Sequence, residues 1–461
     1  MSAKVIDTEG ALPPFWDRSV VFVANLLGLF FGNEEETQIL TNEVGAIDSY
    51  GGRLMPILNL LYQGSDNVLV LESEPDLELC GYFRNSLGLT LPEYHVLSHS
   101  DYMSLTAALK KGASNDELRW GLYSELKANA HKWLDGYVTD DTLADLAGRA
   151  GMRTVSSAAG SRSGNNKRML HEHVESSGLP VVETCLIDSA NDLNAALDSL
   201  QKSGFRSAVI KSAVGASGIG LMKVESLADR GDIVQQLPDH YFFEGACMVQ
   251  GWLRPGENDV LNMRSPSVQL YLDDETVYLY DSTEQILSDD SVHQGNESPP
   301  PYFGGEPGLR DELFHQAGEA ASWLHAQGYR GTGSVDFLVV DYKDRGAVVY
   351  ICEINARVTG ATYPSLLARH FMPKGTWLMR NLRFGKLVTA EEMLGLLRDH
   401  HSLFDPSINE PGILPVNFNR GEDGLIHKGQ FLCMGANLHR THALLDIARR
   451  DLPVAAETDR D

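Results

Sequence analysis

Short apolar segments alternate with helix-like segments over the first part of the chain, and this alternation restricts the fold more than any other feature. Residues 19–24, 67–71 and 94–97 have the composition of strands, and residues 116–130 have a helical pattern. Strands that alternate with helices are typical of a parallel sheet with helices packed on its faces. The sequence therefore predicts an α/β fold.

The length of the chain indicates more than one domain. It has 461 residues, and domains usually contain about 100–200 residues, so two or three are expected. The small, polar segment 156–164 is interpreted as the exit from the first domain, and the C-terminal part mixes helical and strand-like segments. We predict an α/β domain over residues 1–160, a second domain with the functional site over 161–385, and a small α+β domain over 386–461.

The charge balance limits the partners of this chain. Lys and Arg total 38 and Asp and Glu total 63, which gives a net charge of −25. A chain this acidic repels polyanions, so we expect no nucleic-acid partner, and local cations, backbone amides or a metal must hold any anionic ligand. Five scattered cysteines without a CxxC pair argue against disulfides or structural zinc. The sequence shows no signal-peptide pattern and no apolar run of spanning length, so we expect a cytoplasmic protein without a membrane partner.

A glycine-rich loop follows a short apolar strand that ends at Lys211. The loop contains Gly215, Ser217, Gly218 and Gly220. Glycines let a backbone wrap its amides around phosphate oxygens, and a lysine adds a positive charge. The spacing differs from the P-loop, from the dinucleotide-binding fingerprint and from the nucleophile elbow. The loop therefore predicts a phosphate site of another type, with a plain glycine-rich hairpin as the alternative.

Two later strands, joined by a short polar hairpin, carry polar side chains on an otherwise apolar background. Asp336 lies on the first, and Glu353, Asn355 and Arg357 alternate along the second, so these three side chains share one face. A polar face of this kind is costly to bury unless it binds something. Two carboxylates and an amide oxygen are hard ligands that suit Mg²⁺. The alternative is an exposed face with a Glu–Arg pair.

The residues between Lys167 and Tyr363, which include both elements, resemble the ATP-grasp ligases. Six elements follow the order that this family has. The resemblance implies magnesium ligands at Asp336, Glu353 and Asn355. The residues that it assigns to ATP are Lys167 and Lys211 as the nucleotide lysines, Gly215, Ser217, Gly218 and Gly220 in the phosphate loop, Gln250 and Leu253 on the hinge strand, and Glu257 at the ribose.

Two positions depart from the family pattern. Gln250 stands where many members have Glu, and Ser334 stands where many have Arg two residues before the first metal acid. Arg357 is the residue that can replace that arginine. The flanking domains resemble those of the pheganomycin-type peptide ligases, most closely at residues 353–364, 265–269 and 412–415. This implies an N-terminal Rossmann-like pre-ATP-grasp domain, a two-lobed ATP-grasp fold and a small α+β C-terminal domain.

The resemblance also implies an activity. We expect ATP and Mg²⁺, with Mn²⁺ as an alternative, and a ligase that joins a small-molecule carboxylic acid to an amine, such as an amino acid or peptide, through an acyl phosphate. A role in specialised peptide biosynthesis is implied. Arg357 and Lys211 are the expected catalytic residues. The alternatives are ligation to a non-amine nucleophile, a stop at the acyl phosphate, and a nucleotide-binding regulatory protein without turnover.

Three residues are candidates for contact with the substrate. His293 lies in a polar loop after the strand predicted at residues 277–280, Gly360 follows the metal strand, and Tyr363 lies shortly after it. Binding residues are often carried by loops, and a solvated loop residue is the alternative for His293. His171 lacks the spacing of a zinc protease motif, so we expect it on the surface. A homodimer is the common default for such a chain.

Overall fold

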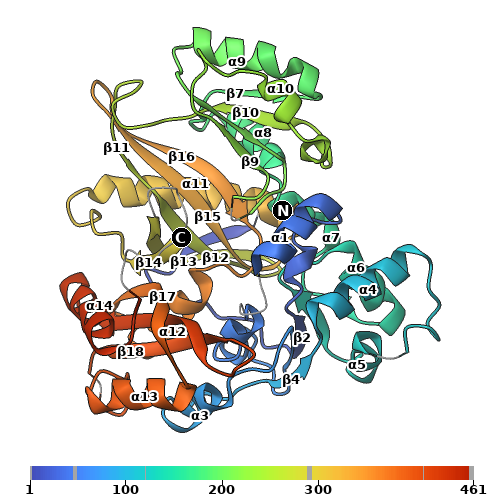
Figure 1. Cartoon of the computed structure of the whole chain (residues 1–461), viewed down its shortest axis with the longest axis vertical. Helices are drawn as coiled ribbons and strands as arrows, with labels where there is room; N and C mark the ends of the chain where they lie inside the picture. The colour runs from blue at the N-terminus through green and yellow to red at the C-terminus, as the bar shows by residue number, and fades with distance from the viewer. Residues whose placement is uncertain are drawn as a thin grey trace.

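The strands of the computed structural model form three sheets, and the predicted α/β class is confirmed (Figure 1). The structure describes residues 3–44, 49–119, 121–216, 218–287, 293–408 and 410–455. One sheet is parallel and lies in the N-terminal region, and a small antiparallel sheet and a large mixed sheet follow it along the chain.

The N-terminal sheet has the order β4-β3-β2-β5-β6, all parallel. Its strands are β2 (Val20–Val23), β3 (Val68–Leu71), β4 (Glu93–Val96), β5 (Trp133–Gly136) and β6 (Arg153–Thr154). The elements around it are η1 (Leu26–Gly28), α1 (Glu34–Val44), η2 (Gly51–Leu54), α2 (Leu58–Leu61), α3 (Leu77–Asn85), α4 (His99–Lys110), α5 (Leu122–Ala128) and α6 (Asp141–Ala150). The predicted helix 116–130 is wrong in its bounds, because Gly121 adopts a φ of +73° directly before α5.

The predicted linker after this sheet is a helix, which corrects its interpretation. α7 (Ala158–Gly164) begins at Ser157, whose hydroxyl accepts from the amide of Gly160 at 2.9 Å. A side chain at Gly160 would clash with the backbone of Tyr329, and one at Gly164 would clash with Leu324. The small residues that resemble a flexible linker therefore serve close packing of α7 against the central region.

The four-stranded antiparallel sheet has the order β7-β10-β8-β9. Its strands are β7 (Thr184–Ile187), β8 (Ala208–Lys211), β9 (Leu221–Val224) and β10 (Cys247–Gly251). α8 (Lys167–Ser176) precedes the sheet, as predicted. The remaining elements of this part are η3 (Ala190–Asp192), α9 (Leu193–Lys202), α10 (Ile233–Gln236) and η4 (Asp239–Phe242).

The large sheet joins the centre of the chain to its C-terminal part. Its path is β11-β15-β12-β13-β14-β17-β19-β18, with β16 beside β15 and β1 (Lys4–Asp7) parallel to β13. The other strands are β11 (Val260–Arg264), β12 (Pro266–Leu272), β13 (Thr276–Leu287), β14 (His293–Ser298), β15 (Gly331–Tyr342), β16 (Gly346–Asn355), β17 (Thr376–Val388), β18 (Gly412–Arg420) and β19 (Ile426–Gly435). The predicted boundary at residues 385 and 386 falls within β17.

α11 (Pro307–Ala326), α12 (Thr362–Phe371) and α14 (Leu438–Asp451) pack on the large sheet, and α13 (Ala390–Asp399) lies against α14 and α3. One apolar cluster contains Tyr62 from the N-terminal part, Tyr271 from the central part, and Trp377 and Phe431 from the C-terminal part. Each of these side chains is almost fully buried. Their packing fixes the N-terminal sheet against the large sheet. Among the described residues, no helix has both the length and the apolar character needed to cross a bilayer.

Candidate active site

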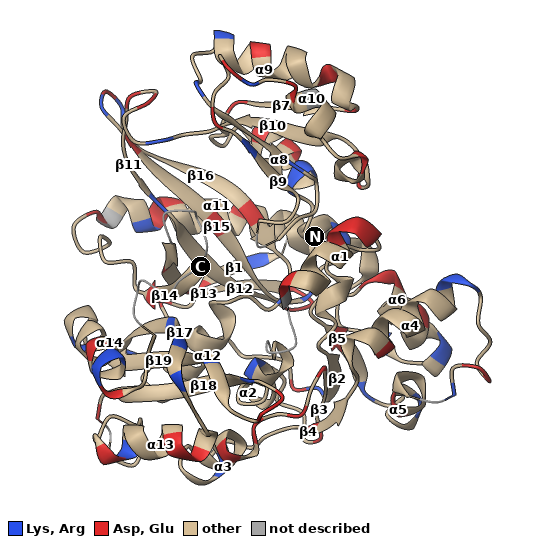
Figure 2. Cartoon of the chain, in the orientation of Figure 1, with Lys and Arg blue, Asp and Glu red and all other residues tan. Residues whose placement is uncertain are grey.

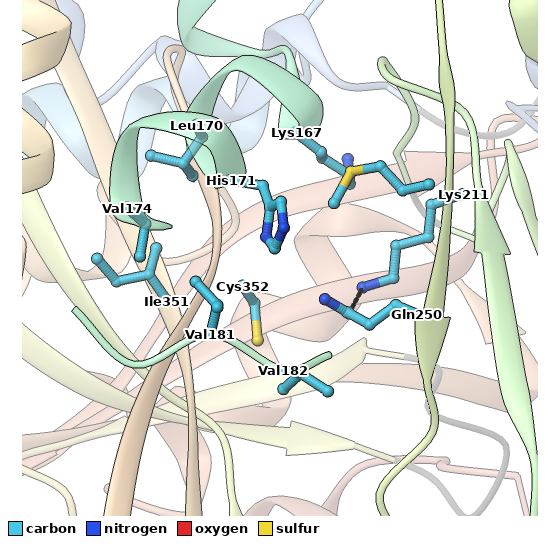
Figure 3. A pocket seen from close by; sticks show the side chains of 11 residues that line it. Lys167, Leu170, His171, Val174, Val181, Val182, Lys211, Gln250, Ile351 and Cys352 are labelled. Atoms are coloured by element: carbon cyan, nitrogen blue, oxygen red, sulfur yellow. Dashed lines mark hydrogen bonds between the residues drawn. The ribbon is translucent and has the colours of Figure 1, made fainter. Parts of the chain in front are cut away.

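A cavity lies between the four-stranded sheet, α8 and β16 (Figure 3). One wall is apolar and the other carries polar and cationic groups. The apolar residues are Leu170, Val174, Val181, Val182, Met248 and Ile351, and the others are Lys167, His171, Lys211, Gln250 and Cys352. An apolar slot with two lysines beside it suits a ligand that combines a flat apolar ring with anionic groups.

Lys211 is the last residue of β8, and its side chain meets that of Gln250 on the neighbouring β10. The Lys211 Nζ donates to Gln250 Oε1 at 2.8 Å (Figure 3). Gln250 Nε2 in turn donates to Thr184 Oγ1 at 2.9 Å. Burial lowers the pKa of Lys211, since a desolvated ammonium is unfavourable. Because Gln250 is neutral, it orients the Lys211 ammonium without neutralising it.

Lys167 connects the glycine-rich loop to the acidic strand. It is the first residue of α8, whose N-cap Asn166 accepts from the amide of Met169 at 3.0 Å. The Lys167 Nζ donates to the carbonyl of Gly215 at 2.6 Å and lies 2.8 Å from Glu353 Oε2. One ammonium thus brings together two elements that are far apart in the sequence.

The predicted metal ligands converge. Asp336 and Glu353 are paired residues of β15 and β16. Asn355 Nδ2 donates to Asp336 Oδ2 at 2.9 Å and lies 3.4 Å from Glu353 Oε1. The described residues contain no group of three or more His, Cys, Asp or Glu side chains arranged for a metal. The third donor of the predicted set is therefore the side-chain amide oxygen of Asn355.

The electrostatics of these acids differ. Burial and the nearby charge of Glu353 raise the pKa of Asp336 to about 6, although Ser267 donates to it at 2.7 Å. Burial acts on Glu353 in the same direction, but Lys167 outweighs it and the pKa of Glu353 is lowered. Two close carboxylates of this kind favour a cation between them. The donor chemistry fits Mg²⁺ or Mn²⁺.

Arg357 follows β16 and is fixed by the segment that precedes α8. Its guanidinium donates to Asn165 Oδ1, and Asn165 Nδ2 donates to the carbonyl of Ala356 at 3.3 Å. Burial lowers the pKa of Arg357, and the charges of Glu353 and Asp336 oppose this shift. A guanidinium remains charged under such conditions and is held beside the acidic set.

The glycine-rich loop closes into a narrow neck. The Ser212 amide donates to the Gly220 carbonyl at 2.8 Å. Gly218 and Gly220 have φ values of +87° and +76°, and a Cβ at Gly215 would lie 2.6 Å from the carbonyl oxygen of Ile219. Glycine is therefore required by backbone conformation and close approach. Ser217, the other predicted loop residue, lies outside the described residues.

Leu253 and Glu257 do not line the cavity as described. Leu253 packs against Val260 and Val340 in a small apolar cluster. Glu257 has a buried Oε2 that accepts no hydrogen bond from any described residue. A buried acceptor without a donor is costly, and a hydroxyl group on a ligand would satisfy it.

The predicted substrate residues meet near a group of arginines. A Cβ at Gly360 would lie 3.2 Å from the Cε1 of His293, whose Nε2 is 2.9 Å from Asn296 Nδ2. Tyr363 is 1% exposed, and its hydroxyl accepts from Gln430 at 2.8 Å. The Arg53 guanidinium lies 4.3 Å from the Tyr50 ring and 5.7 Å from the Tyr363 ring.

These residues come from three parts of the chain: Arg53 from η2, His293 from β14 and Arg380 from β17. Although the His293 side chain is exposed, desolvation of its ring and the charges of Arg53 and Arg380 lower its pKa. Cations gathered in this way form a region that favours an anionic ligand.

Two side chains at the site are not among the sequence predictions. His171 lines the cavity (Figure 3) and stays partly exposed there. It lies one helical turn after Lys167, and this spacing places both residues on one face of α8. Glu36, from α1, is buried against the glycine-rich loop. No local pattern in the sequence points to Glu36, because the contact depends on the tertiary fold.

Comparison with known proteins gives one curated relative and many solved structures. No family model matches the chain. It is 26% identical over 199 residues to the [butirosin acyl-carrier protein]–L-glutamate ligase of Niallia circulans. The matched region covers 43% of this chain and 44% of that relative, so less than half the length of the relative is matched.

The structural likeness extends over nearly the whole chain. Biotin carboxylase from Campylobacter jejuni aligns with a TM-score of 0.58 at 13% identity, over 95% of this chain and 92% of the other. N5-carboxyaminoimidazole synthetase from Staphylococcus aureus aligns with a TM-score of 0.53 at 11% identity, over 98% of this chain and all of the other. The predicted resemblance is therefore confirmed at the level of the fold: this chain has the ATP-grasp fold.

Proposed function

We propose that this chain is an ATP-dependent carboxylate–amine ligase, which forms an amide or peptide bond through an acyl phosphate. The observation that carries the proposal is the position of the Lys167 ammonium, which contacts both the carbonyl of Gly215 in the glycine-rich loop and the carboxylate of Glu353. The phosphate loop and the acidic strand thereby face one another. Solved neighbours with this fold include complexes with ADP and with magnesium ADP.

The cavity suits ATP in both of its parts. The apolar wall formed by Leu170, Val174 and Ile351 fits the adenine ring, and Lys167 and Lys211 are placed for phosphate oxygens. Glu257, with its unsatisfied carboxylate oxygen, is proposed to accept from a ribose hydroxyl. Asp336, Glu353 and Asn355 would hold Mg²⁺, which neutralises charge on transferring phosphates when it is bound.

The proposed reaction has two displacements. A carboxylate oxygen of the acid attacks the γ-phosphorus of ATP, and the bond between that phosphorus and the β,γ-bridging oxygen breaks to release ADP. The amine nitrogen then attacks the acyl carbon, phosphate leaves, and the nitrogen loses a proton. Arg357, held by Asn165, is placed to orient the carboxylate and to stabilise the oxyanion that forms at the acyl carbon.

We propose that the acid binds between Gly360, His293 and Arg53, because the positive potential of Arg53 and Arg380 extends over this region. Its recognition requires residues from the N-terminal, central and C-terminal parts. The acid and amine classes proposed are small carboxylic acids and amino acids or peptides. Butirosin in the name of the curated relative supports a role in specialised biosynthesis.

The test is phosphate release from ATP in the presence of Mg²⁺. Carboxylic acids and amines are supplied singly and in pairs, and products are identified by mass. We expect release only when both an acid and an amine are present, with a product mass equal to their sum minus water. Phosphate release with an acid alone would favour a reaction that stops at the acyl phosphate. Binding of ADP without phosphate release would favour a regulatory protein. An ester or thioester product would favour a non-amine acceptor.

Replacement of Arg53 by Ala tests the acid site. Loss of a charge-assisted contact worth about 1.5–3 kcal/mol raises KM for the acid about 10-fold or more, while KM for ATP changes little. The measurement is steady-state phosphate release with the acid varied. Arg84→Ala, an exposed arginine on α3, is the matched control. Equal KM values for the acid in Arg53→Ala and the unmodified protein would remove Arg53 from the site.

A further inference from the structure

A carboxyl group from the N-terminal part is buried against the glycine-rich loop, and one of its two oxygens has no hydrogen-bond partner among the described residues. Glu36 lies on α1 and is 1% exposed. Its Oε1 accepts no hydrogen bond from any described residue. α1 carries several acidic residues (Figure 2), and its Glu34 and Glu35 are exposed to solvent. An ionised carboxylate in this position would be poorly solvated.

Glu36 contacts the neck of the loop. A Cβ at Gly220 would lie 2.8 Å from Glu36 Oε1 and even closer to Ser212 Oγ. Ser212 and Gly220 are the two ends of the loop, joined by the hydrogen bond from the Ser212 amide to the Gly220 carbonyl. The N-terminal part therefore contacts the loop where it enters and leaves the four-stranded sheet.

The hydrogen bonds at the neck favour a proton on Glu36. The Ser212 hydroxyl donates its only proton to the carbonyl of Val214 at 2.6 Å. In this arrangement the Ser212 oxygen presents lone pairs to its surroundings, which an ionised carboxylate cannot use but a carboxylic acid can. A neutral Glu36 can therefore donate a hydrogen bond to the neck, which an ionised carboxylate cannot do.

The charged and titratable groups around Glu36 do not remove this preference. Burial raises the pKa of Glu36 to about 7; the Ser212 hydroxyl and the Lys167 ammonium partly oppose the shift, and Glu244 adds to it. Glu244 is itself paired with Arg162 at 2.7 Å. The groups that face Glu36 from the packed elements are Ser212 at the neck, Lys167 on α8, His240, Tyr241 and Glu244 in and after η4, and Cys247 on β10.

We propose that Glu36 is a positioning residue, through which the N-terminal part holds the neck of the glycine-rich loop, and that it does so as a neutral carboxylic acid. Its role in the reaction rests on the proposed function, because the loop is then the element that covers the phosphates. The contact itself exists without nucleotide. Glu36 touches no reacting atom and acts through Ser212 and Gly220.

The sign of the pH dependence follows from proton uptake. When the neck separates from α1, Glu36 becomes solvated and its pKa returns toward its ordinary value of 4.5. Between about pH 5 and 7, closing therefore binds a proton, and each pH unit makes closing about tenfold less favourable. Above about pH 7 both states are ionised, and the dependence ends.

The experiment is amide hydrogen exchange of the nucleotide-free protein between pH 5 and 8, with correction for intrinsic rates. We expect the protection of residues 212–224 to fall about tenfold per pH unit up to about pH 7. In Glu36→Gln and in the volume-matched Glu36→Met, we expect the protection of these residues not to change with pH. Glu35→Gln, an exposed neighbour on α1, keeps the slope of the unmodified protein, and protection of β12 reports that each variant is folded.

Two results would overturn the proposal: a level profile in the unmodified protein, or an unchanged slope in either neutral variant. No nucleotide, acid or amine is present, so the outcome is independent of the ligase assignment. If exchange behaves as expected but no acid and amine pair supports phosphate release, the proposed function fails and the contact at the neck stands. If phosphate release succeeds and the exchange profile is level, only the role of Glu36 fails.

Discussion

Replacement of Glu353 by Gln lowers turnover at least about 100-fold, since a charged donor to the transferring phosphates is lost. The amide keeps the size of the side chain but removes the charge that pairs with Lys167 at 2.8 Å. Binding of ADP without Mg²⁺ remains within a few-fold of the unmodified protein, because Lys211 is untouched. Phosphate release measures the first quantity and calorimetric titration the second.

The matched control for this change is Asp344→Asn. Asp344 lies in the exposed turn that joins β15 to β16, on the same hairpin as Glu353, and its replacement leaves turnover unchanged. A thermal unfolding curve shows whether Glu353→Gln is folded. Folded protein with full turnover would contradict the assignment of Asp336, Glu353 and Asn355 to a metal.

Replacement of Lys211 by Met weakens ADP binding about 10- to 100-fold. The reason is the loss of a charge-assisted hydrogen bond to phosphate, worth about 1.5–3 kcal/mol. The stability of the protein does not fall by a comparable amount, because burial disfavours the Lys211 ammonium and Met removes that cost. Calorimetric titration with ADP, together with a thermal unfolding curve, separates the two effects.

Lys223→Met is the control for this second change. Lys223 lies on β9, beside β8, with its ammonium 5.2 Å from the Trp252 ring, and it is not part of the cavity lining. Its replacement leaves ADP affinity unchanged. Equal affinities in Lys211→Met and Lys223→Met would show that phosphate does not contact Lys211.

Local patterns predicted the parts of the site that depend on one or two adjacent strands. Glu353 and Asn355 alternate on β16, and that period places them on one face together. The pairing of β15 with β16 was foreseen from the short polar hairpin between them, and the structure pairs Asp336 with Glu353. Lys211 was found in the same way, as the polar end of an apolar strand before glycines.

Contacts between distant segments were beyond local patterns. Glu36 and Ser212 are far apart in the sequence, and only the packing of α1 against the four-stranded sheet brings them together. The region around His293 has the same character, since η2 and β17 contribute one arginine each and β14 contributes the histidine. The segment that contains α7 has the small, polar composition of a linker. Its glycines serve close packing instead, and composition alone does not distinguish close packing from flexibility.

The continuous large sheet has a consequence for engineering. The same sheet that contains β15, the strand with Asp336, continues through β14 into β17, β19 and β18. Trp377 and Phe431 of this C-terminal part share a core with Tyr62 and Tyr271. A chimera that exchanges the C-terminal part for that of another protein would expose strand edges and break this core. Altered substrate selectivity is therefore better sought by point changes around Arg53, His293 and Arg380 than by recombining whole modules.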